Sequence, residues 1–165
     1  MRRLPLITMA ACAALMFGST VHAQQPAPPP DYGPPVTLEQ AMKVADAAQA
    51  EAKKINMNMA ITVVSPSGDL VYFRKMDGTP YASIAISQHK ARVAATYKRP
   101  SKAFEDRVAS GGIGVTVLSL DGVIASAGGI PLIVGGKIIG AIGVSGGPTG
   151  VLDTQASQAG ADVLK

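Results

Sequence analysis

The chain has 165 residues, of which 47% are hydrophobic and 16% are charged, and its formal net charge at pH 7 is +4. This length is enough for one domain, and the apolar fraction is that of a packed globular protein, so extensive intrinsic disorder is excluded. The one Cys cannot pair within the chain, which also excludes a disulfide-stapled scaffold.

The first 23 residues have the pattern of an export signal. Arg2 and Arg3 make a short positive start, residues 4–21 carry no charge, and the segment ends in Val-His-Ala at Ala23, with small residues where a signal peptidase reads them. We therefore expect residues 1–23 to be a signal peptide and the protein to be periplasmic or secreted. The strongly apolar stretch is shorter than a spanning helix needs, so no membrane span is expected after cleavage. A lipid anchor on the Cys of this segment is the weaker alternative.

Cleavage after Ala23 would change the net charge of the chain and its numbers of Cys and His. Without Arg2 and Arg3 the net charge falls to +2, which is not the footprint of a nucleic-acid-binding protein. The single Cys leaves with the segment, and His89 is the one histidine that remains. These counts argue against a structural zinc site.

Residues 24–35 contain six prolines and cannot contribute a core, so we expect an extended tether there and the domain itself over residues 36–165. A helix is predicted over residues 38–54, because its apolar positions follow the helical period. Thr37 and Gln40 stand three apart at its start and match a capping box.

Two β-rich runs follow, over residues 59–65 and 70–76, and the Pro-Ser-Gly-Asp turn between them predicts a hairpin. The next segment, residues 83–98, is rich in good helix formers and is ended by Pro100. A short helix is predicted over residues 102–109.

Three further strands are predicted over residues 115–120, 129–134 and 137–145, and the Gly-Gly pair between the last two predicts a tight hairpin turn. Asp153 is placed to cap a final helix that runs to the C-terminus. Runs of strands between helices are typical of an α+β domain, with a single antiparallel sheet of about five strands covered by helices.

Four blocks of the sequence stand out: RKMDG at 74–78, ISQHKARVA at 86–94, RPSKAFED at 99–106 and GGIPLIVGGKIIGAIGVSGG at 128–147. Together they resemble the GlcG/HbpS family, to which the C-terminal domain of PduO-type proteins also belongs. The resemblance extends over essentially the whole domain. It implies a profilin-like fold, assembly into homo-oligomers that are often octamers, and binding of haem or a related tetrapyrrole.

A haem site needs an apolar slot, an axial ligand and cations for the propionates. Five side chains are candidate iron ligands: His89, Met76, Tyr81, Tyr97 and Ser101. His89 is the strongest ligand chemically, although its polar neighbours in the sequence favour a solvated helix face. For Ser101 the resemblance implies a hydroxyl ligand, because haem-binding relatives have a threonine in the matching segment. The alternative is that Ser101 caps the helix that follows it.

Positive side chains are concentrated in residues 74–102. This window holds seven of them, Arg74, Lys75, Lys90, Arg92, Lys98, Arg99 and Lys102. Such a cluster is either a solvated face or a clamp for the carboxylates of a ligand. We select Arg74, Lys90 and Arg99 as ligand partners. Lys90 is expected to point inward, because the small alanines around it make that side of the helix narrow.

The glycine-rich stretch 128–150 matches neither a P-loop nor a dinucleotide-binding fingerprint. We expect a hairpin and a loop in which backbones approach closely. A small-anion or haem-edge site at residues 146–150 is the alternative.

Catalytic residues cannot be assigned from the sequence. It has no metal-ligand cluster, and His89 has no visible acidic partner for a triad. Nothing in these residues requires an enzyme, and any chemistry could come from a bound haem iron.

The sequence thus predicts an exported, oligomeric haem-binding protein with a role in haem sensing, scavenging or weak haem-dependent redox chemistry. The alternative is an enzyme or accessory factor that acts on a small carboxylated metabolite, because some relatives accompany glycolate- or diol-utilisation genes. A third hypothesis is a structural oligomer that contacts a membrane sensor.

Overall fold

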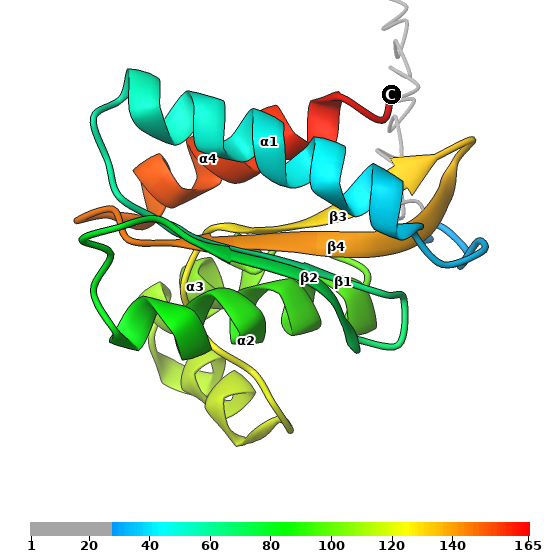
Figure 1. Ribbon diagram of the computed structural model, residues 1–165. Coiled ribbons are helices and arrows are strands. Elements are labelled where there is room, and N and C mark those ends of the chain that lie inside the picture. The colour runs from blue at the N-terminus through cyan, green and yellow to red at the C-terminus, as the bar shows by residue number, and fades with distance from the viewer. Residues whose placement is uncertain (1–27) are drawn as a thin grey trace, which may run out of the picture.

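A computed structural model describes residues 28–165, so the signal peptide expected over residues 1–23 and the start of the tether lie outside the described residues. The described chain forms one four-stranded antiparallel sheet and five helices, which confirms the α+β prediction. Figure 1 shows α1 (Leu38–Lys54) and α4 (Gly150–Asp162) on one face of the sheet and α2 (Ala82–Thr96) on the other.

The strands are arranged in the order β2-β1-β4-β3, and every neighbouring pair is antiparallel. The central strands are β1 (Ala60–Val64) and β4 (Lys137–Ser145), which are buried almost throughout because helices cover both faces of the sheet. The edges are β2 (Leu70–Lys75) and β3 (Gly129–Val134). Both predicted hairpins are therefore present, β1 with β2 and β3 with β4.

Helix α1 begins as the sequence predicts. The Thr37 hydroxyl accepts a hydrogen bond from Gln40 N–H at 3.2 Å, and Gln40 Oε1 accepts one from Thr37 N–H at 2.9 Å, which completes the capping box. Its inner face consists of small buried side chains: Ala41, Val44, Ala45, Ala48 and Ala52. They let α1 pack closely on α4, where a Cβ added to Gly160 would lie 2.8 Å from Val44 O.

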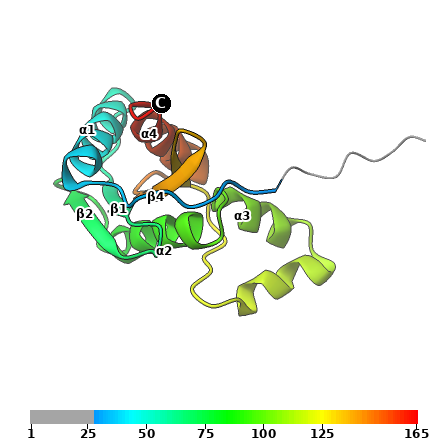
Figure 2. The same ribbon diagram turned by 90° about the vertical axis from the view of Figure 1, so that its right-hand side faces the viewer.

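One predicted strand is wrong. Residues 115–120 lie largely in a 3₁₀ helix, η1 (Gly112–Ser119), that packs on α3 (Lys102–Ala109), so the sheet has four strands and not about five. A short apolar run does not by itself distinguish a buried strand from a helix. Here Gly111 and Gly112, with φ angles of 67° and 53°, turn the chain sharply after α3. Figure 2 shows α3 and η1 projecting from the body of the domain, and we call them the arm.

The last helix begins earlier than predicted. Thr149 is the residue at its N-cap, so the prediction that Asp153 caps this helix is wrong. Asp153 lies in the first turn of α4 and is 3% exposed. A carboxylate this deeply buried needs a partner, and that partner is Lys90.

The described end of the predicted tether lies against the sheet. Ile138 N–H donates to Asp31 O at 2.8 Å, and Gly33 N–H donates to Ile138 O at 2.8 Å. The Tyr32 hydroxyl donates to Ala95 O at 3.1 Å. These residues extend the sheet beside the start of β4, so they contribute to the packing of the domain. None of the helices within residues 28–165 combines the length and apolarity needed to cross a bilayer.

Candidate functional site

A hollow of about 590 Å³ lies between the end of α2 and the arm. This volume is in the range of small-molecule and cofactor sites. Its lining combines apolar side chains with two arginines: Tyr97, Arg99, Ala103, Phe104, Arg107, Val117 and Leu120. We call this hollow the arm groove.

Two aromatic rings meet in the arm groove. The ring centroids of Tyr97 and Phe104 lie 5.2 Å apart with an interplanar angle of 73°, an edge-to-face contact. Phe104 is 5% exposed and anchors α3 to the domain. The Tyr97 hydroxyl donates to Asp121 O at 2.9 Å, which holds the phenol against the chain that leaves η1. The groove thus has an aromatic wall with one hydroxyl at a defined position.

Arg99 and Arg107 bring two positive charges to the arm groove. Both residues are exposed, and Arg99 donates its Nε–H to Tyr97 O at 3.0 Å, which orients its guanidinium group. Guanidinium groups bind carboxylates through two parallel hydrogen bonds. The groove can therefore hold an apolar ligand that carries carboxylates.

Ser101 lies at the base of the arm, and its hydroxyl donates one hydrogen bond and accepts another. It donates to Ser126 O at 2.7 Å and accepts from Gly129 N–H at 2.8 Å, and the residue is fully buried. It has helical backbone angles and no capping hydrogen bond, so the helix cap expected as its alternative role is not formed. Ser101 instead joins the start of the arm to the start of β3.

Lys90 points inward, as its sequence context predicts, and meets a carboxylate there. Its Nζ lies 2.6 Å from Asp153 Oδ2 and 3.2 Å from Val144 O, and the residue is 1% exposed. The other carboxylate oxygen, Asp153 Oδ1, accepts from Gly147 N–H at 2.8 Å. The ion pair thus holds the glycine-rich loop after β4, and the charge of Lys90 is neutralised inside the domain.

Arg74 is bound to α1. Its Nη1 donates to Asp46 Oδ1 at 2.7 Å and to Gln49 Oε1 at 2.9 Å, and its Nη2 donates to the Tyr72 hydroxyl at 2.9 Å. Burial opposes the charge, but the hydrogen bonds with Tyr72 and Asp46 outweigh it and raise the pKa of Arg74 above its ordinary value. The guanidinium group therefore stabilises the packing of β2 against α1.

The predicted site residues do not come together in one place. His89 is exposed on α2 and lines a separate hollow of about 120 Å³ with Arg92. Arg74 and Met76 line a third hollow, of about 410 Å³. Of the eight candidates from the sequence, Tyr97 and Arg99 line the arm groove.

The sequence singles out two of the seven residues that line the arm groove, Tyr97 and Arg99, and misses the other five. Val117 and Leu120 belong to the segment that the sequence assigns to a strand, and Arg107 lies outside the positively charged window. A signal for Arg107 was present, because a helix over residues 102–109 places Ala103 and Arg107 one turn apart on the same face.

Comparison with known proteins identifies the family. The family model described as haem degrading protein HbpS-like matches residues 36–162. The chain is 38% identical over 110 residues to the protein GlcG of Escherichia coli strain K12, an alignment that covers 67% of this chain and 81% of GlcG. The chain therefore belongs to the HbpS-like family, as the resemblance of its four blocks predicts.

Solved structures have the same fold. A double mutant of HbpS from Streptomyces reticuli superposes with a TM-score of 0.74 at 29% identity, covering 94% of this chain and 99% of that chain. A structure described as a PduOC haem complex has a TM-score of 0.71 at 20% identity, covering 79% of this chain and 96% of that chain. The second likeness concerns the fold alone.

Proposed function

We propose that the protein binds haem in the arm groove. Membership of the HbpS-like family supports a haem ligand. The observation that carries the proposal is that Arg99 and Arg107 stand beside apolar walls built by Phe104, Val117 and Leu120. Haem has an apolar ring system and two propionates, which match these walls and the two guanidinium groups.

Tyr97 is the side chain that we assign to the iron. Tyrosine is an axial haem ligand in some proteins, and Tyr97 lines the arm groove. To reach an iron its hydroxyl has to leave Asp121 O, whereas the Ser101 hydroxyl would have to give up two hydrogen bonds inside the domain. His89 lines a different hollow. A bound haem would supply redox-active iron for haem-dependent redox chemistry or haem degradation.

A haemin titration of the double variant Arg99→Gln/Arg107→Gln tests this placement. Each lost charge-assisted hydrogen bond costs about 1.5–3 kcal/mol, so the double variant should bind haemin at least about tenfold more weakly than the wild type. The matched control is Arg92→Gln, which removes an exposed arginine of α2 that lines other hollows. If the double variant binds haemin with wild-type affinity, haem does not bind in the arm groove.

The same two arginines support a second function. A small carboxylated metabolite could bind to Arg99 and Arg107 without haem, as the substrate of an enzyme or the ligand of an accessory factor. This function predicts that glycolate or a similar acid raises the melting temperature of the wild type without an absorption band. The double arginine variant should lose that stabilisation.

We also propose that the protein is exported, as the pattern of residues 1–23 suggests, and that it assembles with copies of itself through the arm. Four large apolar side chains of this region are exposed, including Ile113 at 76% and Leu118 at 57%. An apolar cluster that stays exposed in this way is typical of an interaction surface.

A further inference from the structure

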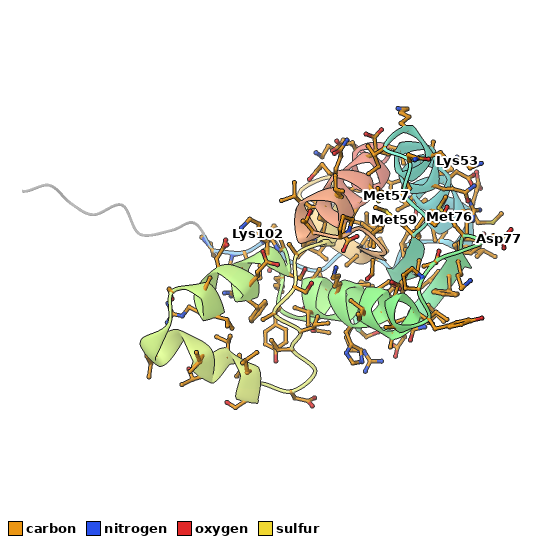
Figure 3. The ribbon with its side chains drawn as sticks, turned by 90° about the vertical axis from the view of Figure 1, so that its left-hand side faces the viewer. Lys53, Met57, Met59, Met76, Asp77 and Lys102 are labelled. Carbon is orange, nitrogen blue, oxygen red and sulfur yellow. The ribbon has the colours of Figure 1, made fainter. Side chains whose placement is uncertain are left out.

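A small hollow of about 120 Å³ lies between α2 and the β1–β2 hairpin, and we call it the hairpin hollow. Drug-sized ligands and cofactors occupy sites of about 300–1,000 Å³, so this hollow admits a molecule of only a few non-hydrogen atoms. Figure 3 shows α2 extending along the sheet between Asp77 at one end and Lys102 of the arm at the other. The hairpin hollow shares no lining residue with the arm groove, so the two are separate sites.

The polar wall of the hairpin hollow comes from α2. Gln88, His89 and Arg92 lie on one side of this helix, because residues three and four positions apart share a face. Within residues 28–165, neither His89 nor Arg92 forms an ion pair with a carboxylate, and residues 1–27 contain no Asp or Glu. The lining of the hollow contains no carboxylate either. The Arg92 guanidinium is therefore available to an anion from solution.

The hairpin turn holds the side chain of Arg92. Gly68 has a φ of 88°, and a Cβ added there would lie 3.0 Å from Arg92 Cγ and 3.6 Å from its Nε. The aliphatic part of Arg92 thus packs directly on the backbone of the turn. A side chain that is already held loses less conformational entropy when it binds a ligand.

The opposite wall of the hairpin hollow is apolar. Val64 of β1 and Leu70 of β2 face each other across the hairpin. Val64 is 2% exposed and packs with the alanines of α2, whereas Leu70 is 58% exposed. The hydroxyl of Thr62, the polar group of this wall, lies 2.9 Å from Ser87 Oγ and is already hydrogen-bonded. A ligand therefore meets a guanidinium group on one side and hydrocarbon on the other.

Two carboxylates lie nearby and limit the charge of the ligand. Arg92 also lines an adjacent hollow, of about 440 Å³, together with Asp69 and Asp121. The Asp69 carboxylate accepts a hydrogen bond from the Ser67 hydroxyl, and neither aspartate forms an ion pair with Arg92. Their repulsion grows with the charge of an approaching anion, so a monoanion is favoured over a dianion such as sulfate.

We propose that the hairpin hollow binds a short aliphatic monocarboxylate of about the size of propionate. Arg92 takes the carboxylate through two parallel hydrogen bonds, and His89 and Gln88 offer further N–H donors. The aliphatic tail lies against Val64 and Leu70, where it removes apolar surface from water. This site does not rest on haem binding in the arm groove.

A titration of the full chain with sodium propionate, followed by NMR at constant ionic strength, tests the proposal. The backbone amide signals of Gly68 and Arg92 should shift and saturate. Arg92→Gln should weaken propionate binding at least about tenfold, because it removes the charge-assisted hydrogen bonds. Arg92 is exposed, and an unchanged melting temperature of the ligand-free variant shows that its fold is intact.

Glycolate is the matched control ligand, since it has as many non-hydrogen atoms as propionate and a hydroxyl in place of the terminal methyl group. It should bind the hairpin hollow at least about threefold more weakly than propionate. Leu70→Ser should weaken the binding of propionate and bring the two affinities closer together. Equal affinities of the wild type for the two acids would overturn the aliphatic specificity.

The double variant Arg99→Gln/Arg107→Gln separates the hairpin hollow from the arm groove. Its propionate-induced shifts at Gly68 and Arg92 should match those of the wild type. If this variant loses propionate binding while Arg92→Gln keeps it, the acid binds in the arm groove and the proposal is wrong. Shifts that do not saturate in the wild type would also overturn it.

Discussion

Lys90 Nζ lies 2.6 Å from Asp153 Oδ2, and the two side chains are 1% and 5% exposed. Lys90 belongs to α2 and Asp153 to α4, helices that cover opposite faces of the sheet (Figure 1). The side chains meet where β3 begins and β4 ends, beside Gly128 and Val144. This buried ion pair is therefore the polar link between the two layers of helices.

Removal of one partner should destabilise the domain strongly. Lys90→Met leaves the Asp153 carboxylate buried without its cation, which typically costs about 3–5 kcal/mol of unfolding free energy. Urea unfolding at pH 7 measures this cost. The double variant Lys90→Met/Asp153→Leu should recover much of it, since it leaves no unpaired charge. A loss below about 1 kcal/mol in the single variant would contradict the role given to the pair.

Gly128 makes room for this ion pair. An added Cβ would lie 2.7 Å from Asp153 Cβ and 2.8 Å from Val144 O, at a φ of 118°. Gly128→Ala should therefore lower the free energy of unfolding by about 2–3 kcal/mol more than Gly135→Ala does. Gly135 is the matched control, because it also has a positive φ, of 56°, but has no atom within 4 Å of an added Cβ. Equal melting temperatures of the two variants would show that the space around Gly128 is not limiting.

Self-association should depend on the apolar side chains of the arm. Ile113→Asp and Leu118→Asp place a charge on the exposed surface of η1, so sedimentation velocity should show smaller species than the wild type forms. Leu38→Asp is the control, because Leu38 is also 57% exposed but lies on α1. If the arm variants sediment like the wild type, the interface lies elsewhere.

Glu51 should contribute to the acid sensitivity of the fold. Its hydrogen bond from Gln155, which links α1 to α4, and a second from Lys54 lower the pKa of the carboxyl below its usual value. A lowered pKa stabilises the folded state above the ordinary pKa, and this contribution disappears as the pH falls through the folded pKa. Glu51→Gln should thus reduce the difference in melting temperature between pH 7 and pH 3. If the difference between the two melting temperatures is unchanged in Glu51→Gln, Glu51 does not contribute to the acid sensitivity.

Local patterns in the sequence predict most of the body of the domain. The capping box at Thr37 and the two hairpins form where they are expected, because capping and turn chemistry act over a few residues. Helix α3 of the arm is predicted, but η1 is missed, because residues 115–120 are apolar enough for a strand and only tertiary packing makes them helical. Asp153 is missed as the partner of Lys90, since the two are brought together by the fold.

The site shows the same division between local and long-range information. The positive window identifies Arg99 but also includes Lys90 and Arg74, whose charges are satisfied by Asp153 and Asp46. A count of charges along a sequence does not reveal which of them are paired in the fold. The arm groove becomes visible once α3 and η1 are placed against the end of α2.

The most direct test of haem binding in the arm groove is a haemin titration at the Soret band of the wild type, Tyr97→Phe, Ser101→Ala and His89→Ala. Our account predicts saturation near one haem per chain and a displaced Soret maximum in Tyr97→Phe. It predicts a wild-type spectrum in His89→Ala and, provided that the variant folds, in Ser101→Ala. A titration that does not saturate, or loss of the Soret band in His89→Ala with Tyr97→Phe unchanged, would contradict the account.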